Sequence, residues 1–178
     1  MPHITTHILI PLVIAEIFRD YSAKKKFYLH YVLIAGIAGI LPDLDIPVSW
    51  LLNAFGAAIN TEIFHRTVTH TLLFLAFFLI LALVFSKTKI KFLSKHKLTL
   101  AGILLAASFG VFTHLLLDAT IDGSIMPFYP LSNLSFGINL MGAISQEFTE
   151  TLLSGIDAII LIAWLIHEEI RHKISKFY

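Results

Sequence analysis

Histidine and aspartate side chains that can bind a metal ion occur in four separate parts of the sequence. Imidazole nitrogens and carboxylate oxygens are common ligands of divalent ions. The chain contains no cysteine, so a metal ion would have to be held by nitrogen and oxygen donors. The candidate ligands are His7, Asp43, Asp45, His65, His70, His114 and Asp118.

Two pairs among these candidates have a spacing that brings their side chains together. His114 and Asp118 are four residues apart in FTHLLLDAT, so on a helix both project from the same face. Asp43 and Asp45 alternate in LPDLDIP, where the flanking prolines favour an extended backbone that would point both carboxylates the same way. Adjacent carboxylates repel unless a cation lies between them. Both pairs therefore favour a bound cation.

The segment HRTVTH, residues 65–70, stands directly before an uncharged stretch that ends at Phe85. His65 and His70 are separated by about 140° around a helix at roughly 100° per residue, so at least one belongs to the turn before the helix. Arg66 between them is suited to bind phosphate oxygens through two hydrogen bonds. An ion pair with Glu62 is the alternative for Arg66.

The composition is that of a membrane protein. Hydrophobic residues make up 57% of the chain and charged residues 14%, with a mean hydropathy of +0.81, whereas soluble domains average about 25% charged residues. The net charge of +1 indicates no particular partner. We expect one domain over residues 1–178, because the sequence has no linker, repeat or low-complexity tract. The first residues lack the features of a cleaved secretory signal, so we expect them in the mature protein.

Apolar stretches predict the fold. Five of them are candidates for crossing a membrane, although several are shorter than the roughly 20 residues of a full span: residues 8–18, 28–41, 71–85, 98–119 and 152–167. A sixth, residues 46–59, is interrupted by polar residues and predicts an interfacial or re-entrant helix. The expected fold is an all-α, polytopic integral membrane helical bundle with about five transmembrane helices plus this extra helix.

The positive charges predict the orientation in the membrane. All lysines and arginines except Arg66 fall in three clusters, at residues 19–26, 87–97 and 171–176. If five segments cross, the clusters face one side, which the positive-inside rule identifies as cytoplasmic. The seven candidate ligands then lie at the opposite side. We therefore expect an inner-membrane protein whose site faces away from the cytoplasm.

The ordered set of these motifs resembles a family. LPDLD, HRTVTH and HLLLDATIDG, with Pro127 and Pro130 in the following loop and a histidine near the N-terminus, are similar to the membrane-bound, metal-dependent hydrolases described as LexA-regulated inner-membrane proteins. The resemblance covers roughly residues 3 to 130. It implies a helical integral membrane hydrolase whose metal ligands are the seven candidates.

A more distant resemblance is to the zinc-dependent phospholipase C and nuclease P1 group. His114 and Asp118 match the HxxxD pair of that group, and Asp43 or Asp45 matches its lone aspartate. The group's later HxxxE, which serves a third zinc, has no counterpart after Asp118. Seven ligands are too many for one tetrahedral zinc, so we expect two divalent ions, zinc foremost and manganese as the alternative.

The depth of the site predicts its substrate. Ligands at the level of lipid headgroups favour a hydrolase that cleaves a phosphoester of a phospholipid or lipid-linked molecule. Asp43 or Asp45 would bridge the ions or orient the attacking water, and Arg66 would bind the phosphate. Membrane lipid is the expected partner and nucleic acid is not, while the oligomeric state stays open.

Other functions fit the same sequence. Glu16 and Asp157 lie within apolar segments, where carboxylates often mark ion or proton routes, so a small ion or proton-coupled transporter is the alternative. Asp157 is also a candidate partner for a metal-bound histidine. A structural membrane protein with a stabilising metal is a third possibility.

The remaining histidines and two late glutamates have less specific interpretations. Glu147 and Glu150, in a loop expected over residues 120–150, are interpreted as helix caps or further ligands. The other histidines are interpreted as snorkelling or hydrogen-bonded residues at the membrane boundary that bind no metal: His3, His30, His96, His167 and His172.

Overall fold

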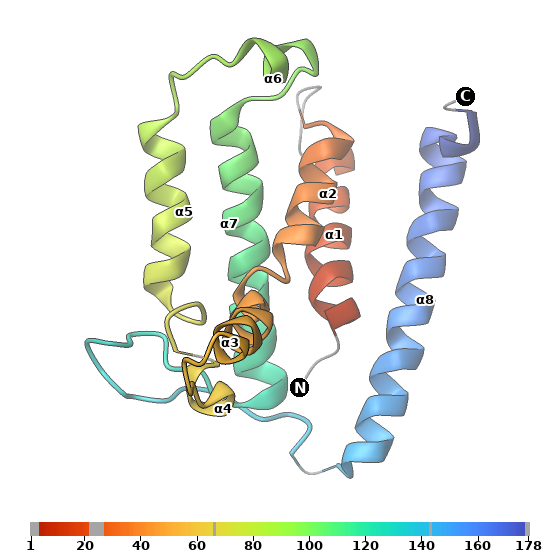
Figure 1. The fold of residues 1–178 in the computed structure, drawn as a ribbon. Helices are drawn as coiled ribbons and strands as arrows, with labels where there is room; N and C mark the ends of the chain where they lie inside the picture. Colours follow the sequence, from red (N-terminus) through yellow and green to blue (C-terminus); the bar gives the residue numbers. More distant parts are fainter. Residues whose placement is uncertain (1–3, 22–26, 66, 143, 177–178) are drawn as a thin grey trace.

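The computed structural model describes residues 4–21, 27–65, 67–142 and 144–176. These residues form helices and loops, with no β-strand among them and one isolated bridge between Ile125 and Phe136 (Figure 1). The expected all-helical fold is therefore confirmed. The α-helices are α1 (Ile4–Tyr21), α2 (Leu29–Ala38), α3 (Asp45–Ala54), α4 (Thr61–Phe64), α5 (Leu72–Val84), α6 (Lys91–Lys95), α7 (Leu100–Leu117) and α8 (Gln146–His172).

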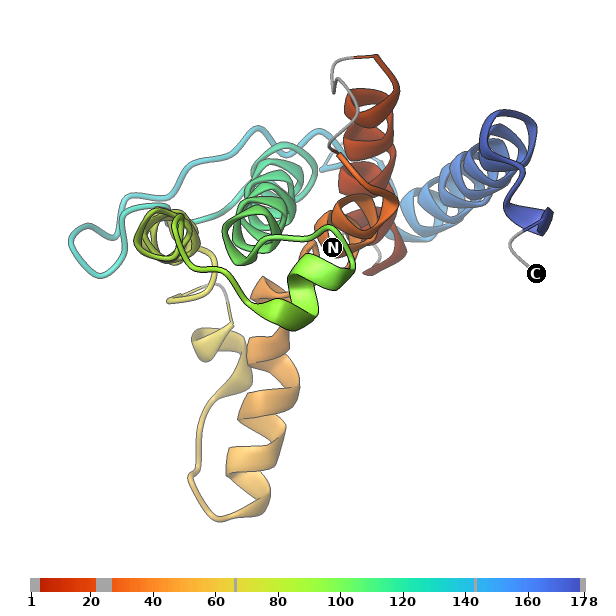
Figure 2. The same ribbon diagram turned by 90° about the horizontal axis from the view of Figure 1, so that it is seen from above.

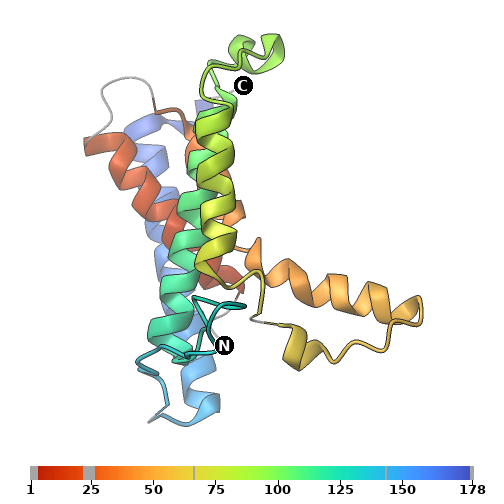
Figure 3. The ribbon, with the colours of Figure 1, turned by 90° about the vertical axis from the view of Figure 1, so that its left-hand side faces the viewer.

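The longer helices run in roughly the same direction, with α1 inclined to α5 and α7 (Figure 3). Figure 1 shows α1, α2, α5, α7 and α8 aligned in this way, with α6 linking α5 to α7 at one end. At the other end, α3 and α4 project sideways from the bundle (Figure 3). Seen from above, α8 lies on the α1 side and apart from α5 and α7 (Figure 2).

Small residues allow α1, α2 and α7 to pack closely. Their shared core contains Leu12, Val32, Ala35 and Ala106. A Cβ at Gly110 of α7 would collide with the carbonyl oxygen of Ala35 in α2. The absence of that side chain lets α2 and α7 approach backbone to backbone, which fixes their relative position.

Three short helical turns complete the chain. A 3-10 turn, η1 (Pro42–Leu44), leads into α3, and a second, η3 (Ile174–Lys176), follows α8. The end of α7 continues as a π-helical turn, η2 (Asp118–Asp122). The expected extended backbone at Asp43 and Asp45 is wrong, because both residues lie in helical turns. A proline in a first turn suits helical geometry, since its fixed φ is pre-organised and its missing N–H costs no bond there.

Fewer helices than expected meet the requirements for crossing a membrane. Among the described residues, Leu100–Ile121 and Glu147–His172 are long and apolar enough, and α2 with the segment Pro42–Ala54, bent by 47°, would make a third. The helix α5 has 13 residues, about 20 Å against a hydrocarbon core of about 30 Å. Charged Glu16, Arg19 and Asp20 interrupt α1.

The last helix begins earlier than expected. Glu147 lies in the first turn of α8, and Glu150 in the next, rather than in a loop. Both side chains are exposed. Glu147 therefore fits the interpretation of an acidic residue at a helix N-terminus, where the helix dipole favours negative charge.

Candidate metal centre

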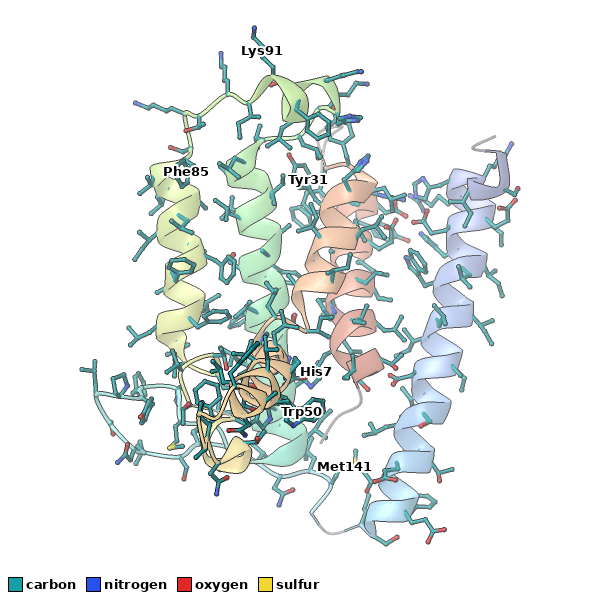
Figure 4. The ribbon with its side chains drawn as sticks, in the orientation of Figure 1. His7, Tyr31, Trp50, Phe85, Lys91 and Met141 are labelled. Carbon is teal, nitrogen blue, oxygen red and sulfur yellow. The ribbon has the colours of Figure 1, made fainter. Side chains whose placement is uncertain are left out.

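The seven candidate ligands lie together at the end of the bundle from which α3 projects. They come from α1, the η1–α3 turn, the segment between α4 and α5, and the end of α7. Figure 4 shows His7 at this end and Lys91 of α6 at the opposite end. The side chains of His70 and His114 have no exposed surface, and those of His7 and Asp118 are 2% exposed.

Four donor atoms form a compact set. Oδ1 of Asp43 lies 3.4 Å from Nε2 of His70 and 3.5 Å from Nε2 of His114. Oδ2 of Asp118 lies 3.5 Å from each of the same nitrogens, and the two nitrogens are 3.1 Å apart. A tetrahedral zinc with bonds of 2.0–2.2 Å separates its donor atoms by about 3.3–3.6 Å. The four distances of 3.4–3.5 Å between oxygen and nitrogen fit ligands around a shared ion, whereas the 3.1 Å between the two nitrogens is also a hydrogen-bond distance.

Hydrogen bonds on the far side of each ring fix where the protons lie. Nδ1 of His114 is 2.6 Å from the carbonyl oxygen of Gly39, which can only accept, so Nδ1 carries the proton. The hydroxyl of Thr69 donates to Oδ2 of Asp45 at 2.8 Å and therefore accepts from Nδ1 of His70 at 3.1 Å. Both Nε2 atoms are left with lone pairs that face the site.

The facing lone pairs need a cation. Nε2 of His70 and Nε2 of His114 are buried 3.1 Å apart, and with both protons on Nδ1 neither can donate to the other. Such a contact is repulsive until a proton or a metal ion shares it. Nε2 of His65 is also buried without a hydrogen-bond partner, since its Nδ1 faces Oδ1 of Asp45 at 2.8 Å.

The donors divide into two adjacent groups. His7, His114 and Asp118 form one, and Asp43, His65 and His70 form the other, with the donor atoms of each within 4.8 Å of one another. Oδ1 of Asp118 lies 3.4 Å from Nε2 of His7, whose ring stacks on that of His114. The contacts of His70 and His114 join the groups. The expectation of two ions stays a prediction.

Nearby carboxylates change the pKa of His70. This residue lies between α4 and α5, outside the candidate spans. Burial opposes a charged imidazole and lowers the pKa of His70. Hydrogen bonds to Asp43 and Asp45 and the charge of Asp118 outweigh that effect, so the pKa of His70 is raised above its ordinary value. The site therefore attracts positive charge even onto a buried ring.

Several residues that sequence reasoning missed support the ligands. Gly39 supplies the carbonyl for His114, and a Cβ there would collide with the backbone oxygen of His7. The sequence gives no signal for this contact. The hydroxyl of Thr69 is hydrogen-bonded to His70. The position of Thr69 between the candidate ligands His65 and His70 in HRTVTH could have indicated this supporting role.

Other expected site residues lie elsewhere. Asp157 accepts a hydrogen bond of 2.9 Å from the hydroxyl of Thr6. Its observed partner is therefore the residue before His7, and not a candidate ligand histidine as expected. Glu16 is buried towards the opposite end of α1. Arg66 lies outside the described residues, as does the side chain of Glu62, so the two interpretations of Arg66 stay predictions.

A comparison with protein families identifies the chain's family. The model described as YdjM inner membrane protein matches residues 1–175, so the chain belongs to this family and is an inner membrane protein. The comparison supports neither the metal-dependent hydrolase resemblance nor the relation to the phospholipase C and nuclease P1 group. Comparisons with curated proteins and with solved structures gave no match.

Proposed function

We propose that this inner membrane protein is a metal-dependent hydrolase that cleaves a phosphoester of a lipid or lipid-linked substrate. The observation that carries the proposal is the buried contact of 3.1 Å between the two Nε2 atoms of His70 and His114. The carboxylates of Asp43 and Asp118 flank both atoms, so two neutral rings and two negative charges enclose a place for a cation.

The donor set fits divalent ions of the zinc type. Asp43, His70, His114 and Asp118 would hold a single ion. With two ions, His7, His114 and Asp118 would hold one, and Asp43, His65 and His70 would hold the other. When bound, such ions make water more acidic and neutralise charge on phosphate oxygens. Nitrogen and carboxylate oxygen donors suit zinc, with manganese as the alternative.

The remaining polar groups position the ligands. Asp45 holds His65 directly and His70 through Thr69, on the Nδ1 side of both rings. That geometry favours a positioning role for Asp45 over the expected role as a ligand, because carboxylates behind metal-bound imidazoles fix the ring and its tautomer. Asp43, which faces the Nε2 atoms, is the better candidate for contact with the ions.

The helix α3, which projects from the bundle together with α4 as a side arm, supports a lipid substrate. Helix α3 leaves the bundle beside the candidate site and runs across the direction of α5 and α7 (Figure 3). It presents exposed Val48, Trp50 and Leu51, followed by Phe55 at 82% exposure, while Ser49 on its other face is buried. An apolar face with a tryptophan suits the interface between lipid and water. An arm at this depth would bring headgroup phosphoesters to the site.

The test combines metal content with turnover. Protein purified in detergent should contain zinc or manganese and lose it on His114→Ala, while His96→Ala, at an exposed histidine in the α6 region, should not change it. Chelated protein reloaded with either ion should release headgroups from phospholipid or phosphate from a lipid pyrophosphate. Metal retention without any such cleavage would favour the structural role and end the hydrolase proposal.

The transporter alternative has a separate test. It depends on Glu16, which is buried within α1 and has an oxygen, Oε2, that makes no hydrogen bond. A proton-coupled transporter should lose function on Glu16→Gln and should purify without stoichiometric metal, whereas the hydrolase should retain metal and lose it on His114→Ala. Arg19 lies 2.6 Å from the other oxygen, which favours a fixed ion pair over a proton route.

A further inference from the structure

A second group of possible ligands lies at the end of α1 away from His7. Glu16 and Asp20 are four residues apart on α1 and share one face, and His167 and His172 face them from α8. One donor atom from each of the four lies within 4.8 Å of the others. The hydrogen bonds of these two histidines to α1 agree with their interpretation as hydrogen-bonded boundary residues, and the expectation that they bind no metal stays a prediction.

The contacts in this group centre on Asp20. Its Oδ2 lies 2.8 Å from Nε2 of His167, and its Oδ1 lies 3.1 Å from Nε2 of His172. The same nitrogen of His172 is 3.4 Å from Oε1 of Glu16. The carboxylates of Glu16 and Asp20 are 3% exposed, so nearly all their contacts are with protein.

In the described part of the chain, this group has two arginines for three buried carboxylates, beside two histidines that carry charge only when protonated. Three buried carboxylates meet here, those of Glu16, Asp20 and Glu168. Arg19 contacts Glu16 and Glu168, at 2.6 and 2.8 Å, and Arg171 contacts Asp20 at 3.0 Å. Oε2 of Glu16 and Oε2 of Glu168 are buried and have no donor from another residue, and the two carboxyl groups are close enough to share a proton or a cation. Unpaired buried carboxylate oxygens are costly, and a cation would satisfy them.

We propose that Glu16, Asp20, His167 and His172 form a second divalent metal site, suited to zinc, that fastens α8 to α1. Two imidazole nitrogens and two carboxylate oxygens are a complete tetrahedral donor set for zinc. The Asp20 contacts of 2.8 and 3.1 Å are hydrogen bonds, so the donors would separate slightly when an ion enters. A cavity of about 260 Å³ runs beside the group, and Glu16, Asp20, Trp164 and His167 contribute to its lining. The site is independent of the proposed hydrolase activity.

A metal ion bound by this group would hold α8 against α1. Few residues of α8 are buried, and these include Asp157, which binds Thr6, and Glu168, which binds Arg19. Since Thr6 precedes His7, α8 contacts α1 beside the first centre and again at the second. A metal ion that holds the far end of α8 would also stabilise the contact beside His7.

The experiment counts zinc in a protein whose first centre is disabled. Full-length protein carrying His70→Ala and His114→Ala is purified in detergent, stripped with a chelator, reloaded with zinc and dialysed. It should retain about one zinc per chain, as the donor set of one tetrahedral site requires. Adding His172→Ala, or Asp20→Asn with its similar size, should remove that zinc, whereas adding His96→Ala should not. Cobalt in place of zinc should give a visible absorption band that follows the same pattern.

The outcomes separate this site from the first. Otherwise wild-type protein with Asp20→Asn should lose about one zinc and keep the zinc that depends on His114, which covers the case in which the multiple variants do not fold. No zinc in the disabled protein, or unchanged zinc after Asp20→Asn, would overturn the second site and leave a metal-free ion-pair cluster. Neither result bears on whether His114 is needed for hydrolysis.

Discussion

At the scale of single residues, the hydrogen bond made by Nδ1 of a histidine determines whether its Nε2 is available to bind a metal ion. The carbonyl oxygen of Gly39 accepts a hydrogen bond from Nδ1 of His114. The hydroxyl of Thr69 accepts one from Nδ1 of His70 and donates its own to Asp45. Each Nε2 is thereby prepared as a ligand before any ion arrives. Removing one of these acceptors should weaken metal binding without removing a ligand.

Thr69→Val tests this preparation with almost no change of shape. The valine keeps the branched side chain but loses the hydroxyl that joins His70 to Asp45. Zinc affinity should fall about 10- to 100-fold, the range for loss of a partner behind a metal ligand. Competition with a chromogenic chelator measures the affinity. Thr69→Ser keeps the hydroxyl and should bind zinc nearly as wild type, and equal affinity in Thr69→Val would contradict the relay.

At the scale of helices, close packing brings the ligands of different elements together. A Cβ at Gly39 would meet the backbone oxygen of His7, so the turn after α2 and the start of α1 are in direct contact. The π-helical turn at Asp118 ends α7 at the same place. Single π-turns within helices are frequent at functional sites, where they adjust the direction of a side chain.

Gly39→Ala should disturb this contact although the backbone there is helical, with φ near −59°. Helix propensity alone predicts a gain of up to about 1 kcal/mol in unfolding free energy, but the collision should cost about 1–3 kcal/mol. It should also displace His7 and lower zinc content. Gly155→Ala in α8, where a Cβ meets nothing within 4 Å, should be neutral or stabilising. Thermal unfolding and elemental analysis of both variants measure the difference.

The sequence predicted helix positions well because each of the five long apolar stretches contains a helix or lies within one. Residues 98–119 enclose α7 (Leu100–Leu117), and residues 71–85 enclose α5. The gathering of His7, Asp43 and His114 also followed from the order of the apolar stretches, which puts their ends on one side. Metal binding by these residues stays a prediction.

Contacts between distant elements were beyond the reach of sequence reasoning. His167 and His172 were interpreted as boundary residues with no named partner, because Asp20, to which both are hydrogen-bonded, lies on another helix nearly the whole chain away. The approach of Gly39 to His7 depends on the crossing of two helices, which no local pattern encodes. Spacing in the sequence identified the possible ligands. Packing of the helices determined which nitrogen of each histidine ring faces the candidate site.

At the scale of the whole molecule, the ends of the bundle differ in charge. Lys89, Lys91 and Lys95 lie at the end formed by α6, where Figure 4 shows Lys91, and Arg171 and Lys173 end α8. The candidate metal centre lies at the other end. Under the positive-inside rule, we predict that the end with α6 is cytoplasmic and that the candidate metal centre faces away from the cytoplasm.

Single cysteines can test this orientation without interference, because the chain has no cysteine of its own. Lys91→Cys and Ser132→Cys introduce thiols at exposed positions in α6 and in the loop between η2 and α8. A membrane-impermeant maleimide should label Ser132→Cys in intact cells and Lys91→Cys only after the membrane is permeabilised. The reverse pattern would put the ligands in the cytoplasm, and equal labelling of both in intact cells would mean that the bundle does not separate the two positions. The orientation matters for the proposed chemistry, because a site facing away from the cytoplasm reaches only the lipids of the outer leaflet of the inner membrane.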